Sequence, residues 1–341
     1  MRQTIRRILM VVLALVFIGS LGMLIYRTRD YQKGEETYAE AETLVELPDL
    51  SELPVPVVEP ETTETGTGET EQPKQVYVDP YADALRNMDF TALREVNSDV
   101  LGWIMIPGTR ISYPLLQGED NQYYLKHTWK KWTSVVGAIF LECQNSPDLS
   151  DFNTIVYGHR MNNGSMFASL KNYKQQSYWA AHPCVYITDD NGSHKYEIFA
   201  AYEVSTAGTT YQLGISSDAS KQAFIDYCLG QSVIDTGITP TVYDRILTLS
   251  TCTGNGHATR WVVQAVLKGV APSDTAPAEE PAPAETAEQP QKAAETAETL
   301  PEEMPAETPE SAEAPEEAPP EETTPEEVLP EEGAQPDQPA A

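Results

Sequence analysis

The stretch 246-ILTLSTCTGNGHATRWVVQAVL-267 contains two apolar runs separated by a polar, glycine-rich segment. Each run has about the length of a typical strand, and the glycines between them favour a turn. Cys252 ends the first run and Arg260 opens the second. If the two strands pair antiparallel, these side chains face each other at the open end of a hairpin. The stretch therefore predicts a β-fold with a cysteine and an arginine side by side.

A cysteine becomes a useful nucleophile when its thiolate is accessible and a base or a cation lies nearby. Arg260 suits the second role, because an arginine keeps its charge and can donate hydrogen bonds to an oxyanion or a substrate carbonyl. One cysteine and one arginine at this spacing also fit a buried structural thiol beside a surface arginine. The choice between the two interpretations depends on a histidine.

The candidate base is His159 rather than the nearer His257. His257 lies within the loop between the two strands, whereas partners in such sites usually come from elsewhere in the fold. His159 closes the run 154-TIVYG-158 and precedes another glycine-punctuated turn. A histidine at a strand end is well placed for general acid–base catalysis. His127 and His182 are interpreted as surface or structural residues. His194 follows a turn and is expected to be exposed.

Eight short apolar runs between turn residues predict a mainly β fold, an eight-stranded small closed barrel. About 190 residues is ample for one such core. The predicted strands are 103–106, 111–117, 135–142, 154–158, 184–188, 195–204, 246–251 and 260–267.

Helical patterns surround and interrupt these runs. Residues 79–97 begin with Asp79 as a cap and a proline at the first helical position, and Asp89 could cap a second short helix. Residues 164–173 form another helical stretch. Residues 218–230 form a helix before the cysteine strand, with Asp218 as its cap.

Four cysteines allow three full pairings. If Cys252 is a free nucleophile, an odd number remains, so a complete disulfide framework is impossible. Reduced thiols packed in the core are therefore expected at Cys143, Cys184 and Cys228.

The net charge of −30 belongs to the flanks. Residues 271–341 carry 21 acidic residues and one lysine, and residues 31–79 carry 13 acidic residues and two lysines. The first segment consists mainly of Pro, Glu, Ala and Thr, so it cannot bury enough apolar surface to fold. We expect residues 271–341 to be a disordered acidic tail and residues 27–78 an acidic linker.

Residues 8–26 contain no charged residue and have about the length needed to cross a bilayer as a helix. A cleaved signal peptide with Ser20 and Gly22 near its cleavage site is the alternative. The apolar run continues past both, which favours an uncleaved single-pass anchor. Residues 1–7 would then be a cytoplasmic head, and the rest of the chain would lie outside the cell.

Other chemistries find no support in the sequence. No Cys-x-x-Cys or His-Glu-x-x-His spacing is present, so no metal site is predicted. The 254-GNG-256 turn lacks the lysine and the following helix of a phosphate-binding loop. The chain has a net charge of −30, so it would repel the phosphate backbone, and nucleic-acid binding is not expected. No cofactor is expected.

Three motifs together resemble the sortase family. The string 249-LSTC-252, followed by an arginine that opens a Trp-Val-Val strand, resembles the sortase cysteine–arginine motif. The segment 154-TIVYGHRMNNGSMFASL-170 resembles the histidine segment of class B sortases, and 97-NSDVLGWIMIPGTRISYPLLQ-117 resembles their opening strands. The resemblance covers about residues 80–269.

The resemblance implies a membrane-anchored cysteine transpeptidase of a Gram-positive cell envelope. Cys252 would attack a Thr–Gly-type bond in the C-terminal sorting signal of a secreted protein, and an amine of a peptidoglycan precursor would resolve the thioester. His159 would be the acid–base, and Arg260 would orient the substrate and stabilise the oxyanion. Ser250 and Thr251 match positions that line the substrate groove. The catalytic domain would span residues 79–270.

Three alternatives stay open at this point. The 79-DPY-81 string matches a lid motif of class C, pilin-polymerising sortases, although here it begins an amphipathic helix. A papain-like cell-wall amidase would also use a cysteine, but it needs a helix rather than a strand at that residue. A non-catalytic anchored protein would use the barrel and the acidic tail to bind a partner.

Overall fold

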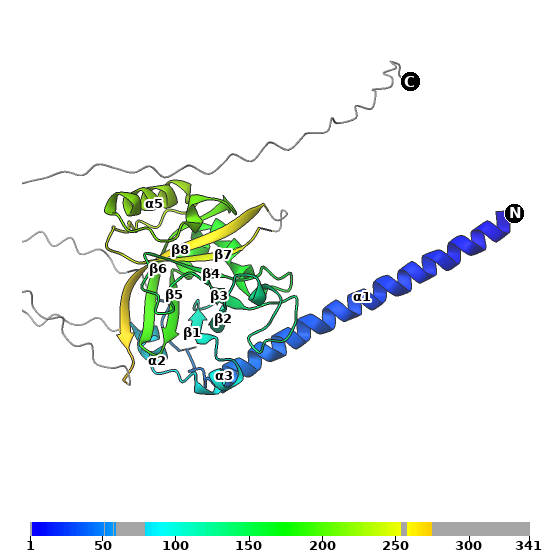
Figure 1. The fold of residues 1–341 in the computed structure, drawn as a ribbon, viewed down its shortest axis with the longest axis horizontal. Helices are drawn as coiled ribbons and strands as arrows, with labels where there is room; N and C mark the ends of the chain where they lie inside the picture. Colours follow the sequence, from blue (N-terminus) through cyan, green and yellow to red (C-terminus); the bar gives the residue numbers. More distant parts are fainter. Residues whose placement is uncertain (1, 51, 57, 59–78, 254–257, 275–341) are drawn as a thin grey trace, which may run out of the picture. The chain divides into compact units, whose positions relative to one another are not determined.

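The computed structural model describes residues 2–50, 52–56, 58, 79–253 and 258–274. All eight predicted runs contain a strand, and the strands form a closed barrel in the order β1-β2-β3-β4-β7-β8-β6-β5 (Figure 1). The strands are β1 (Val100–Met105), β2 (Ser112–Gln117), β3 (Ile139–Leu141), β4 (Asn153–Tyr157), β5 (Cys184–Asp189), β6 (Gly192–Ser205), β7 (Ile246–Cys252) and β8 (Thr259–Pro272).

Two of the barrel's strand pairs are parallel, β2 with β3 and β4 with β7, and the others are antiparallel. The strand predicted at 135–142 is reduced to Ile139–Leu141. Its first part instead turns at Gly137, whose φ of 61° lies in the left-handed region. This turn brings the backbone of residues 134–138 close to the functional site described below.

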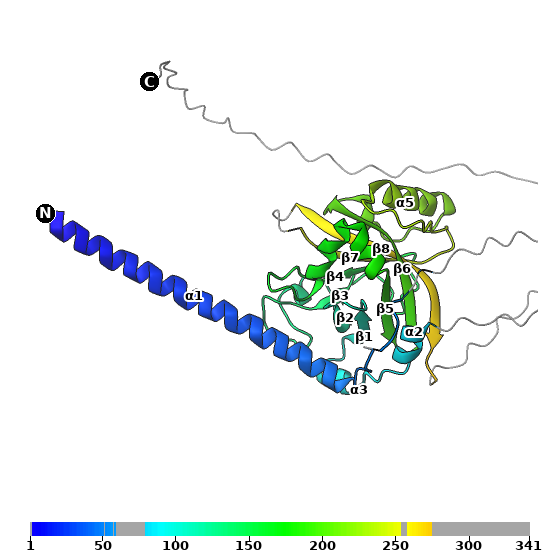
Figure 2. The same cartoon turned by 180° about the vertical axis from the view of Figure 1, so that it is seen from behind.

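The apolar side chains of β7 alternate between two cores, as strand geometry requires. Leu247 and Leu249 face the main barrel core. Ile246 faces a second cluster, which also contains Phe224, Ile225 and Cys228 of helix α5 (Asp218–Gln231). Figure 2 shows α5 on the outside of the barrel, at the side of β6 and β8. The two faces of β7 therefore have different surroundings, and Cys252 shares its face with Ser250 rather than with Thr251.

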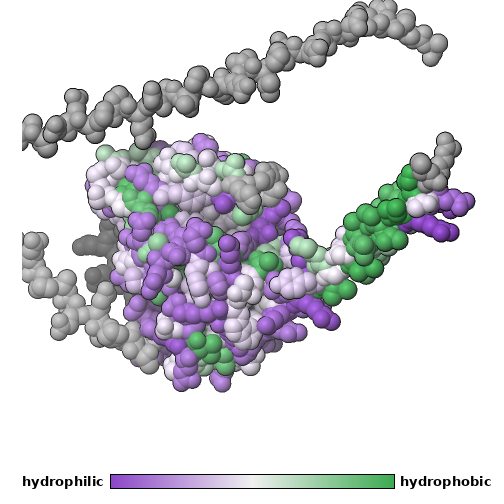
Figure 3. Space-filling view, turned by 45° about the vertical axis from the view of Figure 1, so that its right-hand side comes forward, coloured by the Kyte–Doolittle hydropathy of each residue, from purple (hydrophilic) through white to green (hydrophobic). Residues whose placement is uncertain are grey.

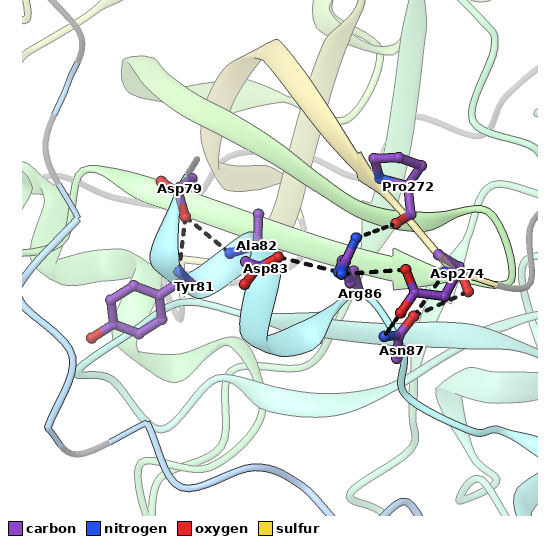
Figure 4. A network of polar contacts seen from close by, with 9 residues as sticks. Asp79, Tyr81, Ala82, Asp83, Arg86, Asn87, Pro272 and Asp274 are labelled. Carbon is purple, nitrogen blue, oxygen red and sulfur yellow. Dashed lines mark hydrogen bonds and ion pairs between the residues drawn. The ribbon is translucent and has the colours of Figure 1, made fainter. Parts of the chain in front are cut away.

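The N-terminal helical region divides into α2 (Pro80–Leu85) and α3 (Thr91–Val96). Asp79 caps α2 as predicted, because its Oδ1 accepts hydrogen bonds from the backbone N–H groups of Tyr81 and Ala82 (Figure 4). Asp89 accepts a hydrogen bond from Thr91 N at 2.9 Å at the start of α3. Beyond α2, Arg86 forms an ion pair with Asp274 at 3.2 Å. This contact ties α2 to the segment that follows β8.

Several helical details differ from the sequence-based expectation. The cap of α5 is Ser217, whose Oγ accepts a hydrogen bond from Ser220 N, and Asp218 is the first helical residue. The stretch predicted at 164–173 is the 3-10 helix η2 (Phe167–Lys174). Three short elements were not predicted because none has an extended apolar period: η1 (Tyr123–Leu125), α4 (Gln176–Ala181) and η3 (Thr209–Tyr211).

The first helix, α1 (Arg2–Leu44), extends well past the predicted membrane segment. Its apolar part is exposed and forms the continuous hydrophobic surface in Figure 3. Tyr38, Ala41 and Val45, by contrast, are buried against the barrel. The prediction that residues 27–78 are a linker throughout is therefore wrong at its start. The segment is acidic overall, but its apolar residues recur at the spacing of one helix face. Residues 59–78 of the predicted linker and nearly all of the acidic tail lie outside the described residues.

Candidate active site

The ends of three adjacent strands bring His159, Cys252 and Arg260 together. Parallel strands β4 and β7 pair Tyr157 with Ser250. His159 lies two residues after Tyr157, and Cys252 lies two residues after Ser250, so the two side chains occur at the same level. On the other side, antiparallel β8 pairs Arg260 directly with Cys252. The cysteine therefore lies between the histidine and the arginine.

The imidazole of His159 is held by a backbone carbonyl on one side. Its Nε2 lies 2.7 Å from Leu125 O. A carbonyl oxygen can only accept, so Nε2 carries a proton. In the neutral ring this leaves Nδ1 as the nitrogen that can take up a proton.

The thiol and the imidazole shift each other's protonation in opposite directions. A hydrogen bond with His159 is the main reason that the pKa of Cys252 is lowered, and the positive charge of Arg260 lowers it further, against the effect of burial. The hydrogen bond with Cys252 likewise raises the pKa of His159, although burial of the ring opposes this. Both shifts favour a thiolate beside an imidazolium, the state in which a cysteine is a strong nucleophile.

Two other thiols have environments that shift the pKa in the opposite direction. Burial raises the pKa of Cys143, and it raises the pKa of Cys228 to about 11. None of the four cysteines forms a disulfide within the described residues. Cys184 and Cys228 are buried as expected, whereas Cys143 is partly exposed. A raised pKa keeps Cys143 and Cys228 as thiols, so they are poor candidates for the nucleophile.

Arg260 is accompanied by a second guanidinium that the sequence analysis did not select. Arg260 is partly buried, and its Nη1 donates a hydrogen bond to Thr259 O at 3.1 Å. Arg160, next to His159, donates from Nη1 to Thr253 O, and its charge also lowers the pKa of Cys252. Its position directly after the candidate histidine was the available signal. The site therefore holds two cations on opposite sides of the cysteine strand.

The two predicted groove residues have different environments. Ser250 is buried, and its Oγ shares a hydrogen bond of 2.8 Å with the hydroxyl of Tyr211. Thr251 is buried on the opposite face of β7, and its hydroxyl has no hydrogen-bond partner within the described part of the chain. Tyr211 was not among the predicted site residues, because it lies in the short η3 turn, where no sequence pattern marks it.

The other described histidines take no part in this arrangement. His127 stacks on Tyr123, and His182 bonds through Nδ1 with Pro107 O at 2.9 Å. His194 lies 3.2 Å from Asp189, and only 4% of its surface is exposed. The expectation that His194 is exposed is wrong, because β6 continues through it and pairs with β5 and β8. His257 lies in the undescribed loop between β7 and β8.

Comparison with known proteins shows similarity to sortases. A sortase domain matches residues 104–268 of the chain. Sortase B of Staphylococcus aureus is 34% identical over 163 residues, which cover 48% of this chain and 67% of that protein. Sortase B of Listeria monocytogenes is 37% identical over 160 residues, covering 47% of this chain and 65% of that protein.

The chain belongs to the sortase family. Solved structures agree with this assignment. A Staphylococcus aureus sortase B–substrate complex matches with a TM-score of 0.51 and 33% identity, covering 53% of this chain and 85% of the other. Sortase B of Bacillus anthracis matches with a TM-score of 0.54 and 29% identity, covering 70% of this chain and 98% of the other.

Membership makes this protein a cysteine transpeptidase with the eight-stranded sortase barrel, similar to class B enzymes. The papain-like alternative is wrong, because Cys252 ends a strand of a closed barrel. The non-catalytic alternative is set aside by the family assignment.

Proposed function

We propose that Cys252 is the nucleophile, His159 the acid–base and Arg260 the oxyanion-stabilising residue of this sortase. The observation that carries the proposal is the position of Cys252 between the other two side chains, with the thiol pKa lowered and the imidazole pKa raised. Such opposed shifts are typical of an activated cysteine–histidine pair.

The first half of the reaction forms a thioester. The Cys252 thiolate attacks the carbonyl carbon of a threonine in the substrate, and the carbonyl oxygen becomes an oxyanion. Arg260 donates hydrogen bonds to that oxyanion. The tetrahedral intermediate expels the amine of the following residue, which takes the proton from His159. The acyl group is now bound to sulfur, and His159 is neutral.

The second half transfers the acyl group. An amine of a cell-wall precursor attacks the thioester carbon, and neutral His159 accepts the proton that the amine loses. The bond to Cys252 breaks and restores the thiolate, so both groups return to their starting states. The product is an amide between the substrate threonine and the amine.

Similarity to sortase B supports a proposal for the substrate class. One similar structure is a Staphylococcus aureus sortase B–substrate complex. We propose secreted proteins with a C-terminal sorting signal as acyl donors and a peptidoglycan precursor as the acceptor. Ser250 and Tyr211 would support the wall of the substrate groove. Thr251 would contribute only through its backbone, since its side chain faces the barrel core.

We also propose that residues 8–26 anchor the enzyme in the cell membrane, with residues 1–7 in the cytoplasm and residues 79–270 as the catalytic domain outside. In support, α1 is the one helix of the described residues that is long and apolar enough to cross a bilayer, with a mean hydropathy of 2.9 in its most apolar window. Five arginines flank the apolar run. Protease treatment of intact cells tests the orientation: cleavage of the barrel from outside supports it, and protection contradicts it.

The enzymatic proposal is tested by incubating the chain with fluorescent peptides of the NPxTx, SPxTG and LPxTG types. Hydroxylamine or an amine serves as the acceptor. Cleavage that is lost in Cys252→Ala supports the proposal, whereas the absence of any Cys252-dependent cleavage contradicts it. A preference for a pilin lysine as the acceptor would instead support the class C-like, pilin-polymerising alternative.

A further inference from the structure

The part of α1 nearest the barrel contacts a loop that surrounds His159. Tyr38 donates a hydrogen bond from its hydroxyl to Gly137 O at 2.6 Å. One residue earlier, Thr37 O accepts a hydrogen bond of 2.8 Å from Trp129 Nε1. Tyr38 is 6% exposed and Trp129 is fully buried. The helix is therefore tied to residues 129–137 by two buried hydrogen bonds.

Gly137 lies directly against the imidazole. A Cβ placed on this glycine would come within 2.8 Å of His159 Cδ2 and within 2.7 Å of Tyr124 O. Real Cβ atoms essentially never lie this close to a non-bonded atom, so only a glycine lets the backbone approach the ring so closely. The position of the Gly137 peptide thus limits where the His159 ring can lie.

The Gly137 turn is also hydrogen-bonded to η1, the segment whose last carbonyl orients the ring. Ala138 N donates a hydrogen bond to Tyr124 O at 2.9 Å, which holds the Gly137 turn beside η1. The next carbonyl, Leu125 O, is the acceptor for His159 Nε2. A shift of the Gly137 turn would therefore move both the packing surface of the imidazole and its hydrogen-bond partner.

A second contact connects Tyr38 to the chain that follows His159. The rings of Tyr38 and Tyr113 pack edge to face, with centroids 5.2 Å apart. The Tyr113 hydroxyl accepts a hydrogen bond from Met166 N at 2.9 Å. Phe167 N in turn donates to His159 O at 2.9 Å. Tyr38 is thus linked to both backbone segments that hold the histidine.

We propose that Tyr38 is a positioning residue for His159, and that the membrane-proximal turns of α1 are a working part of the catalytic domain. Its hydroxyl fixes Gly137 O, and through that turn it fixes the imidazole at the distance from Cys252 that sustains the hydrogen bond between them. The inference rests on the proposed role of His159 as the acid–base. It goes further by assigning a role in catalysis to a residue on the anchor helix.

The test uses the full chain in detergent micelles and compares Tyr38→Phe with two references. Tyr81→Phe is the matched control, because Tyr81 is also buried and also hydrogen-bonds a backbone carbonyl, Leu53 O, but lies away from the site. His159→Ala is the second reference, because it removes the proposed base completely. For each variant we would measure kcat and KM for peptide cleavage, the melting temperature, and the rate of iodoacetamide labelling at Cys252 against pH by mass spectrometry.

We expect Tyr38→Phe to lower kcat about tenfold with little change in KM, since small misplacements of catalytic groups are costly. The midpoint of Cys252 labelling should rise towards the higher pH of His159→Ala. Tyr81→Phe removes a longer hydrogen bond, of 3.5 Å, so it should lower the melting temperature no more than Tyr38→Phe does and leave kcat and the labelling midpoint unchanged. If Tyr38→Phe fails to fold, Trp129→Phe replaces it, because it removes the neighbouring hydrogen bond to Thr37 O.

The outcomes separate the two proposals. Tyr38→Phe behaving like Tyr81→Phe, while His159→Ala shifts the labelling midpoint, overturns the role of Tyr38 alone. An unchanged labelling midpoint in His159→Ala overturns the proposed cysteine–histidine pair itself, and the inference with it.

Discussion

Cys252 and Arg260 are register partners across β7 and β8, so the proposed nucleophile and its cation are fixed by backbone pairing rather than by a flexible loop. The undescribed residues 254–257 lie within the connection between them. His159 reaches the same place from the parallel neighbour β4. The ends of three neighbouring strands thus hold the proposed catalytic residues, and the strand pairing fixes their spacing.

Arg260→Lys should lower kcat/KM about 100-fold, because lysine keeps the charge but loses the planar fork that can donate two hydrogen bonds to an oxyanion. Arg160→Lys is the comparison, since Arg160 also lowers the Cys252 pKa and is held by Thr253 O. We expect its effect to be several times smaller. Steady-state peptide cleavage measures both, and equal losses would contradict the assignment of the oxyanion role to Arg260.

The pH dependence follows from the signs of the two shifts. The thiolate forms above the Cys252 pKa, which lies below the usual 9.0, and the imidazolium persists up to the His159 pKa, which lies above the usual 6.5. Labelling of Cys252 should therefore remain fast below pH 9 and fall only as acid protonates the thiolate. In His159→Ala the midpoint should move to higher pH, because the main cause of the lowered pKa is gone. Identical midpoints would refute this prediction.

The same pair makes a stability prediction. The Cys252 pKa is lowered on folding, so its contribution to stability is present when the thiolate forms and is lost as the pH falls through the folded pKa. The His159 pKa is raised, so its contribution is lost as the pH rises through the folded value. Cys252→Ala should therefore flatten the pH dependence of the melting temperature between the lowered pKa of Cys252 and its usual value of 9.0. An unchanged pH profile in the variant would speak against the pair.

Gly137→Ala should remove activity and lower stability by about 2 kcal/mol or more, because the new methyl group would contact His159 and Tyr124 O at impossible distances. Gly214→Ala is the matched control. Gly214 has a similar φ of 64°, but a Cβ there meets nothing within 4 Å. Gly214→Ala should therefore lose only the stability that backbone strain costs, and it should cleave the peptide at the normal rate. A fully active Gly137→Ala would contradict the close approach of this turn to the imidazole.

Truncation measures how much α1 contributes to the fold. A chain that begins at residue 29 keeps Tyr38, Ala41 and Val45, whereas one that begins at residue 51 exposes the apolar surface that they cover. We expect the shorter chain to lose about 2–4 kcal/mol of unfolding free energy relative to the longer one, from the burial of these side chains. Urea unfolding gives the comparison, and equal stabilities would show that this part of α1 is only a spacer.

The strands could be predicted from sequence because each is a short apolar run between turn residues, and the pairing of Cys252 with Arg260 followed from one hairpin. The ends of helices were harder to predict from the sequence. At α5 two adjacent residues, Ser217 and Asp218, can both act as caps, and only the backbone geometry decides between them.

The packed part of α1 was missed for a different reason. The acidic composition of residues 27–78 predicts a linker, but the apolar residues Tyr38, Ala41 and Val45, which contact the barrel, recur at helical spacing. Tyr211 and Gly137 could not have been assigned to the site, because each reaches it only through tertiary contacts with Ser250 and with His159.

The most direct test of the central claim is to trap the covalent intermediate. The full chain is incubated with a sorting-signal peptide without an acceptor amine, quenched in acid and digested for mass spectrometry. We expect the peptide that contains Cys252 to carry an acyl group ending in the substrate threonine. Hydroxylamine should remove this group, and it should be absent in His159→Ala. Cleaved peptide without that adduct, or an adduct on Cys143 instead, would contradict it.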